Sequence, residues 1–340
     1  MRAVLLPGDK RVVVEDLPTP DPQGDEVLVR TRASAICRSD MSIYYGNPIV
    51  GSGATELIIP GHEAAGEVVA VGPNVTSTKV GDRVAGYLAI ADPNAPYSAQ
   101  GLPMLEPDWK CFGFDVHGGD AEYFLLPERN CLPLPESISF KAGAVLTDMV
   151  GTQYSTQKRL GVSGRQTVAV VGLGPMGAAA VLVAKALGAR VIAVDVLDSR
   201  LQQASDLGAD DVVNSAATDA AEAIRGLTRG IGADVVIECS GNPRGQNSAL
   251  DAAARRGAVA FVGESRATEI NPSDQIIRKL LTVIGGWYFG RGEWDEIVRF
   301  VEDRAVPVEK LISHEFSIEQ AEEAFAAFDR RETEKAVFVW

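Results

Sequence analysis

The chain has 340 residues, of which 46% are hydrophobic and 23% charged, a composition typical of a soluble globular protein with about two domains. Its 46 acidic and 32 basic side chains argue against a nucleic-acid partner, which needs a basic face. No apolar run is long enough to span a membrane and no secretory leader is present, so we expect a cytoplasmic protein without a membrane partner. Its cysteines are too few and scattered for a disulfide scaffold, and each is a candidate thiol or ligand: Cys37, Cys111, Cys131 and Cys239.

Residues 1 to about 150 have the pattern of a mostly β domain. Short apolar or alternating runs are separated by proline and glycine, as in the segment 18–22. Such spacing predicts a barrel-like β fold. The runs interpreted as strands are 11–15, 26–33, 66–72, 83–87 and 121–126.

Two short motifs in this region contain residues that bind metals. Cys37 lies in the segment A-I-C-R-S-D, and His62 lies in P-G-H-E-A-A-G. Asp148 follows in an otherwise apolar, helix-like stretch, where a buried carboxylate needs a cation. A thiolate, an imidazole and a carboxylate form a zinc ligand set that leaves one position open. Spacing alone does not show that they meet, and a buried cysteine with a core histidine is the alternative.

From about residue 151, apolar strands alternate with helical segments. This order predicts a doubly wound parallel sheet that binds its ligand at the carboxyl ends of the strands. We expect the strand ends 238–241, 262–265 and 285–290 to face a cofactor, although a glycine there is more often simply a turn. The six predicted strands are 168–171, 191–194, 211–213, 234–238, 258–262 and 282–286.

The first of these strands leads into the turn Gly172-Leu-Gly174-Pro-Met-Gly177. These glycines permit a tight turn, close approach to a pyrophosphate and helix–strand packing. Asp195 ends the next strand, 18 residues after the last glycine, where a carboxylate binds ribose hydroxyls and repels a 2′-phosphate. The pattern therefore predicts NAD rather than NADP, the alternative being a glycine turn in an ordinary parallel-sheet protein.

Several signals mark helix ends and the last segment of the chain. Asp198 is expected to be a helix N-cap, and Gly208 is expected just past the end of that helix. Residues 293–302 and 318–328 are predicted helices, the second capped by Ser317. A final strand over 335–340 needs a sheet to join, and the pattern does not say which.

The sequence resembles the zinc-containing alcohol dehydrogenases of the medium-chain dehydrogenase/reductase superfamily over essentially its whole length. The motifs that carry the resemblance are C-R-S-D (37–40), G-H-E-A-A-G (61–66), V-G-D-R-V (80–84), G-L-G-P-M-G (172–177) and E-C-S-G (238–241). The resemblance implies an α/β protein in which a GroES-like β-barrel catalytic domain, residues 1–150, is completed by a C-terminal return, 291–340. A Rossmann domain with a six-stranded sheet is implied for 151–290.

The resemblance also implies roles for individual residues. Cys37, His62 and Asp148 look like the zinc ligands, with Glu63 as a carboxylate that exchanges with zinc-bound water. Ser39 resembles the proton-relay hydroxyl and Asp40 the acid that orients the histidine. The residues that match cofactor contacts are Arg38, Thr152, Gly172, Gly174, Pro175, Met176, Gly177, Asp195, Arg200 and Lys335. For the Arg and Lys residues among them, a solvated surface charge is an equal alternative.

Two departures from the family pattern carry consequences. The family's structural zinc needs four cysteines near residues 90–115, and only Cys111 is present, so we predict one catalytic zinc per chain, with His117 and His314 structural. The outer-relay histidine that many members carry five residues after the zinc cysteine is Ser42 here. The route of the proton beyond Ser39 therefore stays open.

These features together predict a zinc- and NAD-dependent dehydrogenase. Zinc would act as a Lewis acid on the substrate oxygen, Ser39 would accept the hydroxyl proton, and hydride would pass to the nicotinamide. The resemblance is nearest to the polyol, secondary-alcohol and threonine dehydrogenase branch of the family, and together with Glu63, Tyr44 and Tyr45 it implies a secondary alcohol or polyol as substrate, with a primary or aromatic alcohol left open. The alternative role of the two tyrosines is packing. The alternatives are a zinc-free quinone or enone reductase and a non-catalytic NAD(H)-binding protein. We expect a homodimer or homotetramer, joined through strand 281–286.

Overall fold

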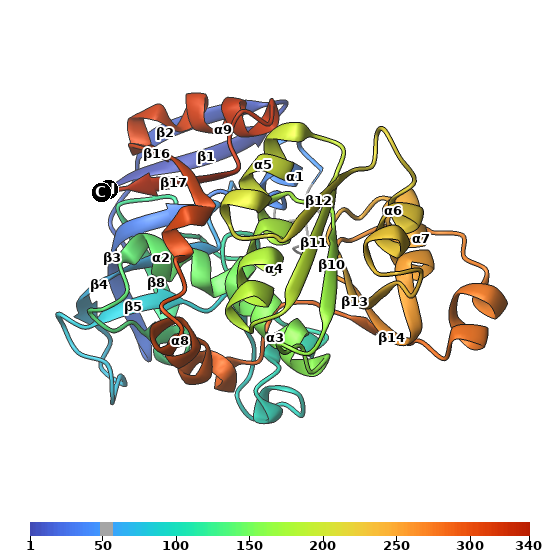
Figure 1. Cartoon of the computed structure of the whole chain (residues 1–340). Helices are drawn as coiled ribbons and strands as arrows, with labels where there is room; N and C mark the ends of the chain where they lie inside the picture. Colours follow the sequence, from blue (N-terminus) through green and yellow to red (C-terminus); the bar gives the residue numbers. More distant parts are fainter. Residues whose placement is uncertain (48–56) are drawn as a thin grey trace. The chain divides into compact units, whose positions relative to one another are not determined.

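The computed structural model describes residues 1–47 and 57–340, which divide into two compact units (Figure 1). Unit 1 comprises Met1–Asp148, Gly290–Glu296 and Val308–Trp340, and unit 2 comprises Met149–Phe289 and Ile297–Pro307. The divisions near 148 and 290 lie close to the predicted domain boundaries, but 297–307 groups with unit 2. Helix α8 (Trp294–Asp303) crosses this division, and its Phe300 packs on Tyr154 of unit 2, with ring centroids 4.7 Å apart.

Unit 1 is built on a β-sheet. Within the described residues, its largest sheet has seven strands in the order β16-β17-β3-β4-β5-β9, with β8 also pairing with β3. Two further pairs, β1–β2 and β6–β7, form small antiparallel sheets. The bounds are β1 Arg2–Gly8, β2 Arg11–Asp16, β3 Glu26–Ala35, β4 Glu63–Val71, β5 Arg83–Gly86, β6 Ala89–Ile90, β7 Lys110–Cys111, β8 Tyr123–Pro127, β9 Cys131–Pro133, β16 Ile312–Phe316 and β17 Lys335–Val339.

The last strand of the chain joins the sheet of unit 1. Strand β17 pairs antiparallel with β3, opposing Val337 to Ala35, and pairs parallel with β16. The apolar run that the sequence left without a partner therefore fills a place beside β3. Phe338 on this strand is fully buried and packs near Phe325 of helix α9.

Short helices complete unit 1. Ser317 is the N-cap of the segment that begins at Ile318: its backbone N donates to Gln320 Oε1 at 3.0 Å, and its carbonyl oxygen accepts from Gln320 N at 3.0 Å. The predicted helix 318–328 is thus a 3-10 turn followed by an α-helix. The bounds are α1 Asp40–Tyr44, α2 Phe140–Val145 and α9 Ala321–Asp329; the 3-10 turns are η1 Ser98–Gln100, η2 Pro103–Leu105, η3 Glu128–Asn130, η7 Arg291–Glu293, η8 Val308–Leu311 and η9 Ile318–Gln320.

Unit 2 contains the predicted doubly wound sheet. Its six strands have the order β12-β11-β10-β13-β14-β15, and every pairing between them is parallel. This is the strand order of a Rossmann fold. In Figure 1, helices α4 and α5 lie on one side of strands β10–β13, and α6 and α7 lie on the other. The strands are β10 Thr167–Val171, β11 Arg190–Asp195, β12 Asp211–Asn214, β13 Ala233–Glu238, β14 Ala253–Phe261 and β15 Thr282–Gly285.

The helices of unit 2 correct one predicted cap. Helix α5 begins at Asp198 and its N-cap is Leu197, whose side chain makes no cap hydrogen bond. The Asp198 carboxylate instead accepts from Asn214 Nδ2 at 2.7 Å. Gly208 lies just past the helix end with φ +99°, as predicted. The bounds are α3 Gly151–Arg159, α4 Pro175–Ala186, α5 Asp198–Asp206, α6 Ala220–Leu227, α7 Pro243–Ala252, the 3-10 turn η6 Ile277–Lys279, and the π-helical segments η4 Leu146–Val150, which the division between the units crosses, and η5 Pro272–Ile276.

Candidate metal site and nucleotide-binding turn

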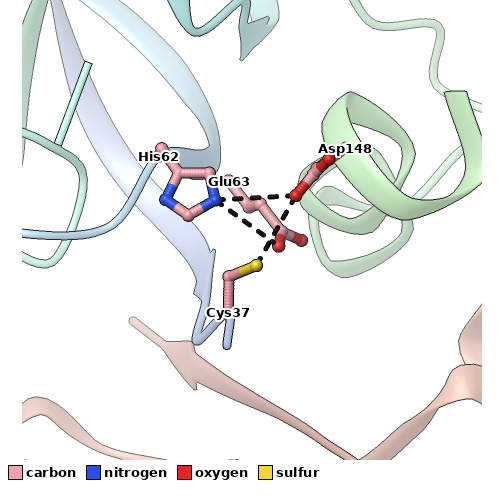
Figure 2. Close-up of side chains that lie close together, drawn as sticks. All are labelled: Cys37, His62, Glu63 and Asp148. Atoms are coloured by element: carbon pink, nitrogen blue, oxygen red, sulfur yellow. Dashed lines mark hydrogen bonds and ion pairs between the residues drawn. The ribbon is translucent and has the colours of Figure 1, made fainter. Parts of the chain in front are cut away.

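Four side chains of unit 1 converge on one point (Figure 2). Cys37 follows strand β3, and His62 and Glu63 lie at the start of β4, which pairs with β3 so that Ala35 opposes Glu63. Asp148 comes from the π-helical segment η4, a local distortion that is frequent at functional sites. One ligand atom from each residue lies within 4.8 Å of the others. Sheet pairing thus brings Cys37 to His62 and Glu63, which sequence spacing could not connect, and η4 adds Asp148.

The separations fit a tetrahedral zinc ion. Asp148 Oδ2 lies 3.6 Å from Cys37 Sγ and 3.5 Å from His62 Nε2, while Glu63 Oε1 lies 4.0 Å from His62 Nε2. Ligands bound to zinc at its usual distances lie roughly 3.3–3.8 Å apart. The two distances from Asp148 Oδ2 therefore match the spacing of zinc ligands, and the thiol, the imidazole and the carboxylate are donor types that zinc prefers.

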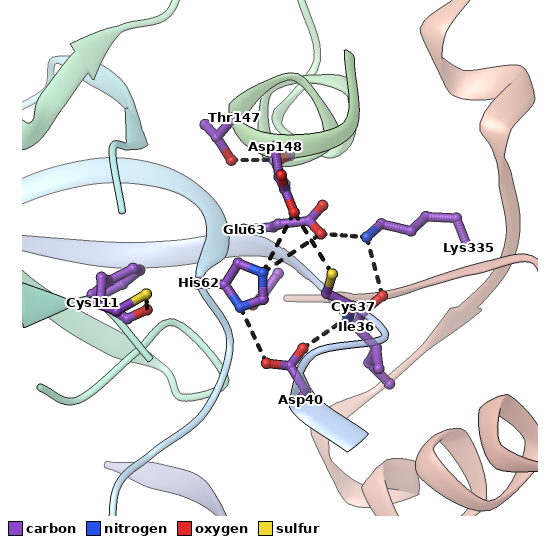
Figure 3. Close-up of polar contacts among 12 residues, drawn as sticks. Ile36, Cys37, Asp40, His62, Glu63, Cys111, Thr147, Asp148 and Lys335 are labelled. Atoms are coloured by element: carbon purple, nitrogen blue, oxygen red, sulfur yellow. Dashed lines mark hydrogen bonds and ion pairs between the residues drawn. The ribbon is translucent and has the colours of Figure 1, made fainter. Parts of the chain in front are cut away.

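Asp40 supports two of these residues at once (Figure 3). Its Oδ1 lies 3.1 Å from His62 Nδ1, and its Oδ2 accepts from the backbone N of Cys37 at 2.7 Å. The carboxylate is fully buried at the first position of α1. A hydrogen bond at Nδ1 leaves Nε2 as the free lone pair that faces Asp148, which is how a carboxylate orients a metal-binding histidine.

Lys335 brings a buried positive charge to the same cluster. Its Nζ donates to Glu63 Oε1 at 2.5 Å and to the backbone carbonyl of Ile36 at 3.1 Å, as Figure 3 shows. Both side chains of the ion pair are almost fully buried. Glu63 Oε2 has no hydrogen-bond partner among the residues that the structure describes. An unsatisfied carboxylate oxygen beside three ligand atoms is a further sign of a missing cation.

The electrostatics of the cluster follow from burial and from its negative charge. Burial would lower the pKa of His62, but Asp40 and Asp148 outweigh it and raise that pKa well above its usual value. Burial raises the pKa of Glu63 to about 8, opposed mainly by Lys335, and it raises the pKa of the Cys37 thiol. Burial also disfavours the charged form of Asp148, yet its hydrogen bond with His62 lowers its pKa overall. Positive charge stabilises every ionised acid in this cluster.

In unit 2, the glycine turn has the predicted geometry. Gly172 has φ +86°, and a Cβ there would lie 2.6 Å from the Cβ of Ser240. A Cβ on Gly177 would overlap the carbonyl oxygen of Gly172. Gly174 is the N-cap of α4, with Pro175 as the first helical residue and Met176 next. The N–H groups and the positive end of the helix dipole at this turn suit a pyrophosphate.

Asp195 ends strand β11 beside this turn and is buried. Its Oδ2 accepts from Leu173 N at 2.6 Å, and its Oδ1 accepts from Val196 N at 2.7 Å. Arg200 on α5 approaches to 3.8 Å between NH1 and Oδ2, and its guanidinium also lies next to Gly174. The predicted ribose-binding acid, the predicted basic residue and the glycine turn are thus neighbours within one unit.

Comparison with known proteins shows the family of this chain. An alcohol dehydrogenase GroES-like domain matches residues 23–136, and a zinc-binding dehydrogenase domain matches 175–303. A zinc-type alcohol dehydrogenase-like protein of Escherichia coli is 35% identical, over 96% of this chain and 95% of its own. The chain belongs to the zinc-type alcohol dehydrogenase family. It is therefore an oxidoreductase that acts on alcohols, and its resident cofactors are zinc and a nicotinamide dinucleotide.

Further relatives support the same family. Sorbitol dehydrogenase of Bacillus subtilis is 32% identical, over 95% of this chain and 92% of its own. A solved NAD-dependent alcohol dehydrogenase covers 100% of both chains at 30% identity with a TM-score of 0.87. A zinc-binding dehydrogenase from Sinorhizobium meliloti, solved with NADP, covers 100% of this chain and 99% of its own at 26% identity with a TM-score of 0.91. Members of this fold thus differ in the dinucleotide that they hold.

Within this family framework, the other predicted cofactor residues take varied positions. Thr152 is buried on α3, whereas Arg38 is exposed. Ser39 is the half-buried N-cap of α1 and makes no capping hydrogen bond with its side chain. Lys335 is not the solvated surface charge that was its alternative, because two of its three donors bind Glu63 and Ile36. Contacts of these residues with a cofactor stay predictions.

The tyrosines after the zinc-ligand candidate pack instead of marking a substrate. Tyr44 is buried and stacks on Phe325 of α9, with centroids 5.8 Å apart. The hydroxyl of Tyr45 donates to Asp329 of the same helix. The alternative role of packing is therefore the one that the structure supports, and these residues carry no argument about substrate.

In this member of the zinc-type alcohol dehydrogenase family, carboxylates organise residues 92–115. Glu106 is buried, and its Oε1 accepts from the backbone N of Tyr97 at 2.6 Å and of Ser98 at 2.8 Å. Asp115 Oδ2 accepts from the backbone N of Cys111 at 2.8 Å.

Within the described residues, the cluster of Figure 2 is the one group of three or more Cys, His, Asp or Glu side chains near enough to hold a metal. One zinc per chain stays a prediction.

The two remaining histidines lie outside the cluster of Figure 2. His117 Nδ1 accepts from the backbone N of Ile59 at 3.2 Å. His314 lies exposed on β16, where its Nδ1 is 3.0 Å from Ser313 Oγ.

Over residues 1–47 and 57–340, no helix is long and apolar enough to cross a membrane.

Proposed function

We propose that this protein catalyses reversible hydride transfer between NAD and a secondary alcohol or polyol, with zinc held by Cys37, His62 and Asp148. The observation that carries the proposal is the convergence of these three ligand atoms at distances that suit zinc. Glu63 would lie beside the metal as a fourth, exchangeable carboxylate. Bound zinc supplies Lewis-acid chemistry, which polarises a substrate oxygen and lowers the pKa of a hydroxyl.

The residues around the metal would hold ligands and protons in place. Asp40 fixes the tautomer and the orientation of His62 and restrains the backbone at Cys37. Ser39 is a half-buried residue two positions after Cys37, and it would accept the proton that the substrate hydroxyl gives up. Lys335 donates to Glu63 Oε1 and opposes the rise in the pKa of Glu63 that burial causes.

Unit 2 would hold the dinucleotide. The turn Gly172–Gly177 would bind the pyrophosphate through backbone N–H groups at the start of α4, and Asp195 would accept from the ribose hydroxyls and repel a 2′-phosphate. Arg200 would lie near the adenine ribose, Arg38 and Lys335 near the pyrophosphate, and Thr152 on the nicotinamide side. The nicotinamide supplies the hydride acceptor. A structural neighbour that holds NADP makes the dinucleotide preference a matter for direct measurement.

The substrate class rests on the relatives. Sorbitol dehydrogenase of Bacillus subtilis and an L-threonine 3-dehydrogenase are 32% and 33% identical to this chain, and sorbitol and L-threonine are polar molecules that carry secondary hydroxyl groups. A polyol, a cyclitol or another secondary alcohol is therefore the substrate that we propose, with primary and aromatic alcohols as outcomes of a substrate panel. A zinc-free quinone or enone reductase has no use for the Cys37, His62 and Asp148 set, and a protein that only binds NAD(H) has no use for it either.

The substitution Cys37→Ala tests the metal assignment. It removes one of three ligands, so we expect zinc retained per chain and NAD reduction both to fall to background. Cys131→Ala is the matched control, because Cys131 is buried in strand β9 and its thiol contacts the carbonyl of Pro127. A Cys37→Ala protein that keeps wild-type zinc content and turnover would contradict the proposal.

We further propose that the protein is a homodimer or homotetramer joined through segment 281–286. Strand β15 within it lies at the edge of its sheet, and the preceding Leu280 is 72% exposed. A strand edge presents unpaired backbone groups that another strand can bind. Light scattering that gives the mass of a single chain would contradict this proposal.

A further inference from the structure

A fully buried carboxylate lies at the carboxyl end of β13, close to the nucleotide-binding turn. Glu238 is the last residue of the strand and is 0% exposed. Its Oε1 accepts from Ser240 N at 2.8 Å and from the Ser240 hydroxyl, and its Oε2 accepts from Gly241 N at 3.3 Å. The side chain therefore folds over the turn that follows its own strand and holds that turn with a charged acceptor.

The turn that Glu238 holds is packed against the glycine turn. A Cβ on Gly172 would lie 2.6 Å from the Cβ of Ser240 and 2.7 Å from its backbone N. The neighbouring backbone is connected as well, since Cys239 N donates to the carbonyl of Val171 at 2.8 Å. Ser240 thus packs directly against Gly172, the first residue of the turn Gly172–Gly177.

Two more glycines leave the carboxylate and its turn little room to shift. A Cβ on Gly245 of α7 would lie 3.1 Å from Glu238 Oε1 and would overlap the Ser240 hydroxyl. A Cβ on Gly263, after β14, would overlap the backbone N of Gly241. Displacing the Ser240–Gly241 turn would therefore require movement of the glycine turn, of α7 or of the segment after β14.

Packing alone does not account for an acid at this position. Burying a carboxylate is costly unless hydrogen bonds compensate it, and burial does raise the pKa of Glu238 against the opposing bonds from Ser240 and Gly241. An apolar side chain would fill the space at lower cost but would leave these donors unpaired. The carboxyl ends of the strands are also where a doubly wound sheet binds its ligand.

We propose that Glu238 is a positioning residue for the dinucleotide: through Ser240 it holds the turn Gly172–Gly177 in the geometry that binds the pyrophosphate. The proposal rests on dinucleotide binding by unit 2, which is part of the proposed function. Glu238 itself need not touch the cofactor. Because the turn is already ordered, less free energy is lost in ordering it when the dinucleotide binds.

The test measures the Kd for NADH of the zinc-loaded enzyme by a titration that is followed by NADH fluorescence. Glu238→Gln replaces one acceptor oxygen with an N–H₂ group that cannot accept, and Ser240→Ala removes only the hydroxyl. We expect each variant to raise the Kd for NADH about tenfold, the loss typical of one charge-assisted hydrogen bond. Because both act through one contact, we expect the double variant to be no weaker than about the worse single variant.

Further readouts separate positioning from a general loss of structure. We expect the KM for NAD to rise while the KM for the alcohol, the zinc content and the melting temperature stay close to wild type. Glu222→Gln, which removes an exposed carboxylate from α6, is the control for loss of charge and should leave the Kd unchanged.

Three results would overturn the inference. Wild-type NADH affinity in both Glu238→Gln and Ser240→Ala would do so, and so would additive effects in the double variant. Weakening in parallel with lost zinc and a lower melting temperature would show a purely structural role. Failure of the proposed function looks different, because the wild-type protein would then hold no zinc or reduce no NAD whatever Glu238 does.

Discussion

Lys335 and Glu63 show how one buried residue depends on another at the metal site. Their side chains are 1% and 0% exposed and are joined at 2.5 Å. Desolvation would lower the pKa of Lys335, but Glu63 raises it overall, so the ammonium stays charged. Breaking such a pair leaves a buried charge without its counter-ion, which costs more than the pair itself contributes.

Lys335→Met should therefore destabilise the protein strongly. We expect a loss of about 3–5 kcal/mol in the free energy of unfolding, because Glu63 is left buried and unpaired. The control is Lys141→Met, which breaks a half-exposed pair with Glu315 and should cost at most about 1 kcal/mol. Chemical denaturation of both variants measures the difference. Equal losses, or no recovery on adding Glu63→Gln to Lys335→Met, would contradict this explanation.

Asp195 governs the choice of dinucleotide in our interpretation. Val196 beside it is 53% exposed, so an arginine can be placed there without disturbing the core. Asp195→Asn combined with Val196→Arg should lower the preference for NAD over NADP, as ratios of kcat/KM, by about tenfold or more. Val196→Arg alone, with the carboxylate kept, is the control. An unchanged ratio in the double variant would count against the ribose role of Asp195.

At the scale of elements, the carboxylate of Glu128 joins two loops of unit 1. Oε1 accepts from the backbone N of Thr76, Ser77 and Thr78 at 3.1, 2.6 and 2.7 Å. Burial opposes ionisation, but hydrogen bonds from the Ser77 hydroxyl and these backbone groups lower the pKa of Glu128 from 4.5 to about 2. The charged side chain thus connects η3 with the loop after β4.

This shift predicts a dependence of stability on pH. Since the folded pKa lies below the unfolded one, the stabilisation is complete above about pH 4.5 and is lost as the pH falls toward 2. Glu128→Gln should cost about 1 kcal/mol at pH 7, a figure that allows for solvent screening. The melting temperatures of the wild-type protein and of Glu128→Gln should therefore differ at pH 7 and converge as the pH falls below about 4.5. The exposed Glu136→Gln is the control, and a gap that does not narrow with falling pH would contradict the assignment.

The elements differ in how far sequence alone predicts them. Strands β10, β11 and β13 of unit 2 follow from apolar runs that are mostly buried, and β3 and β4 from alternation. Strands β6 and β7 have two residues each, too few to show any period. Asp198 looked like an N-cap because its residue type favours that position, but the turn before α5 is held by Asp195 through Val196 and Leu197.

At the scale of the molecule, unit 1 assembles its site from distant parts of the chain. Cys37, His62 and Asp148 could be selected by residue type and by resemblance to a family. The pairing of β3 with β4 brings Cys37 to His62, whereas Asp148 reaches them from η4. The role of Lys335 could not be predicted in this way. It lies 272 residues from Glu63, and only the pairing of β17 with β3 brings its ammonium group to the metal site.

The most direct test of this account is the zinc content of the wild-type protein, purified without added metal and assayed for NAD reduction with a panel of polyols and secondary alcohols. We expect about one zinc ion per chain, activity that is lost on chelation and restored by zinc, and turnover of at least one such alcohol. A metal-free protein that is fully active, or one that reduces enones or quinones with no zinc bound, would contradict it.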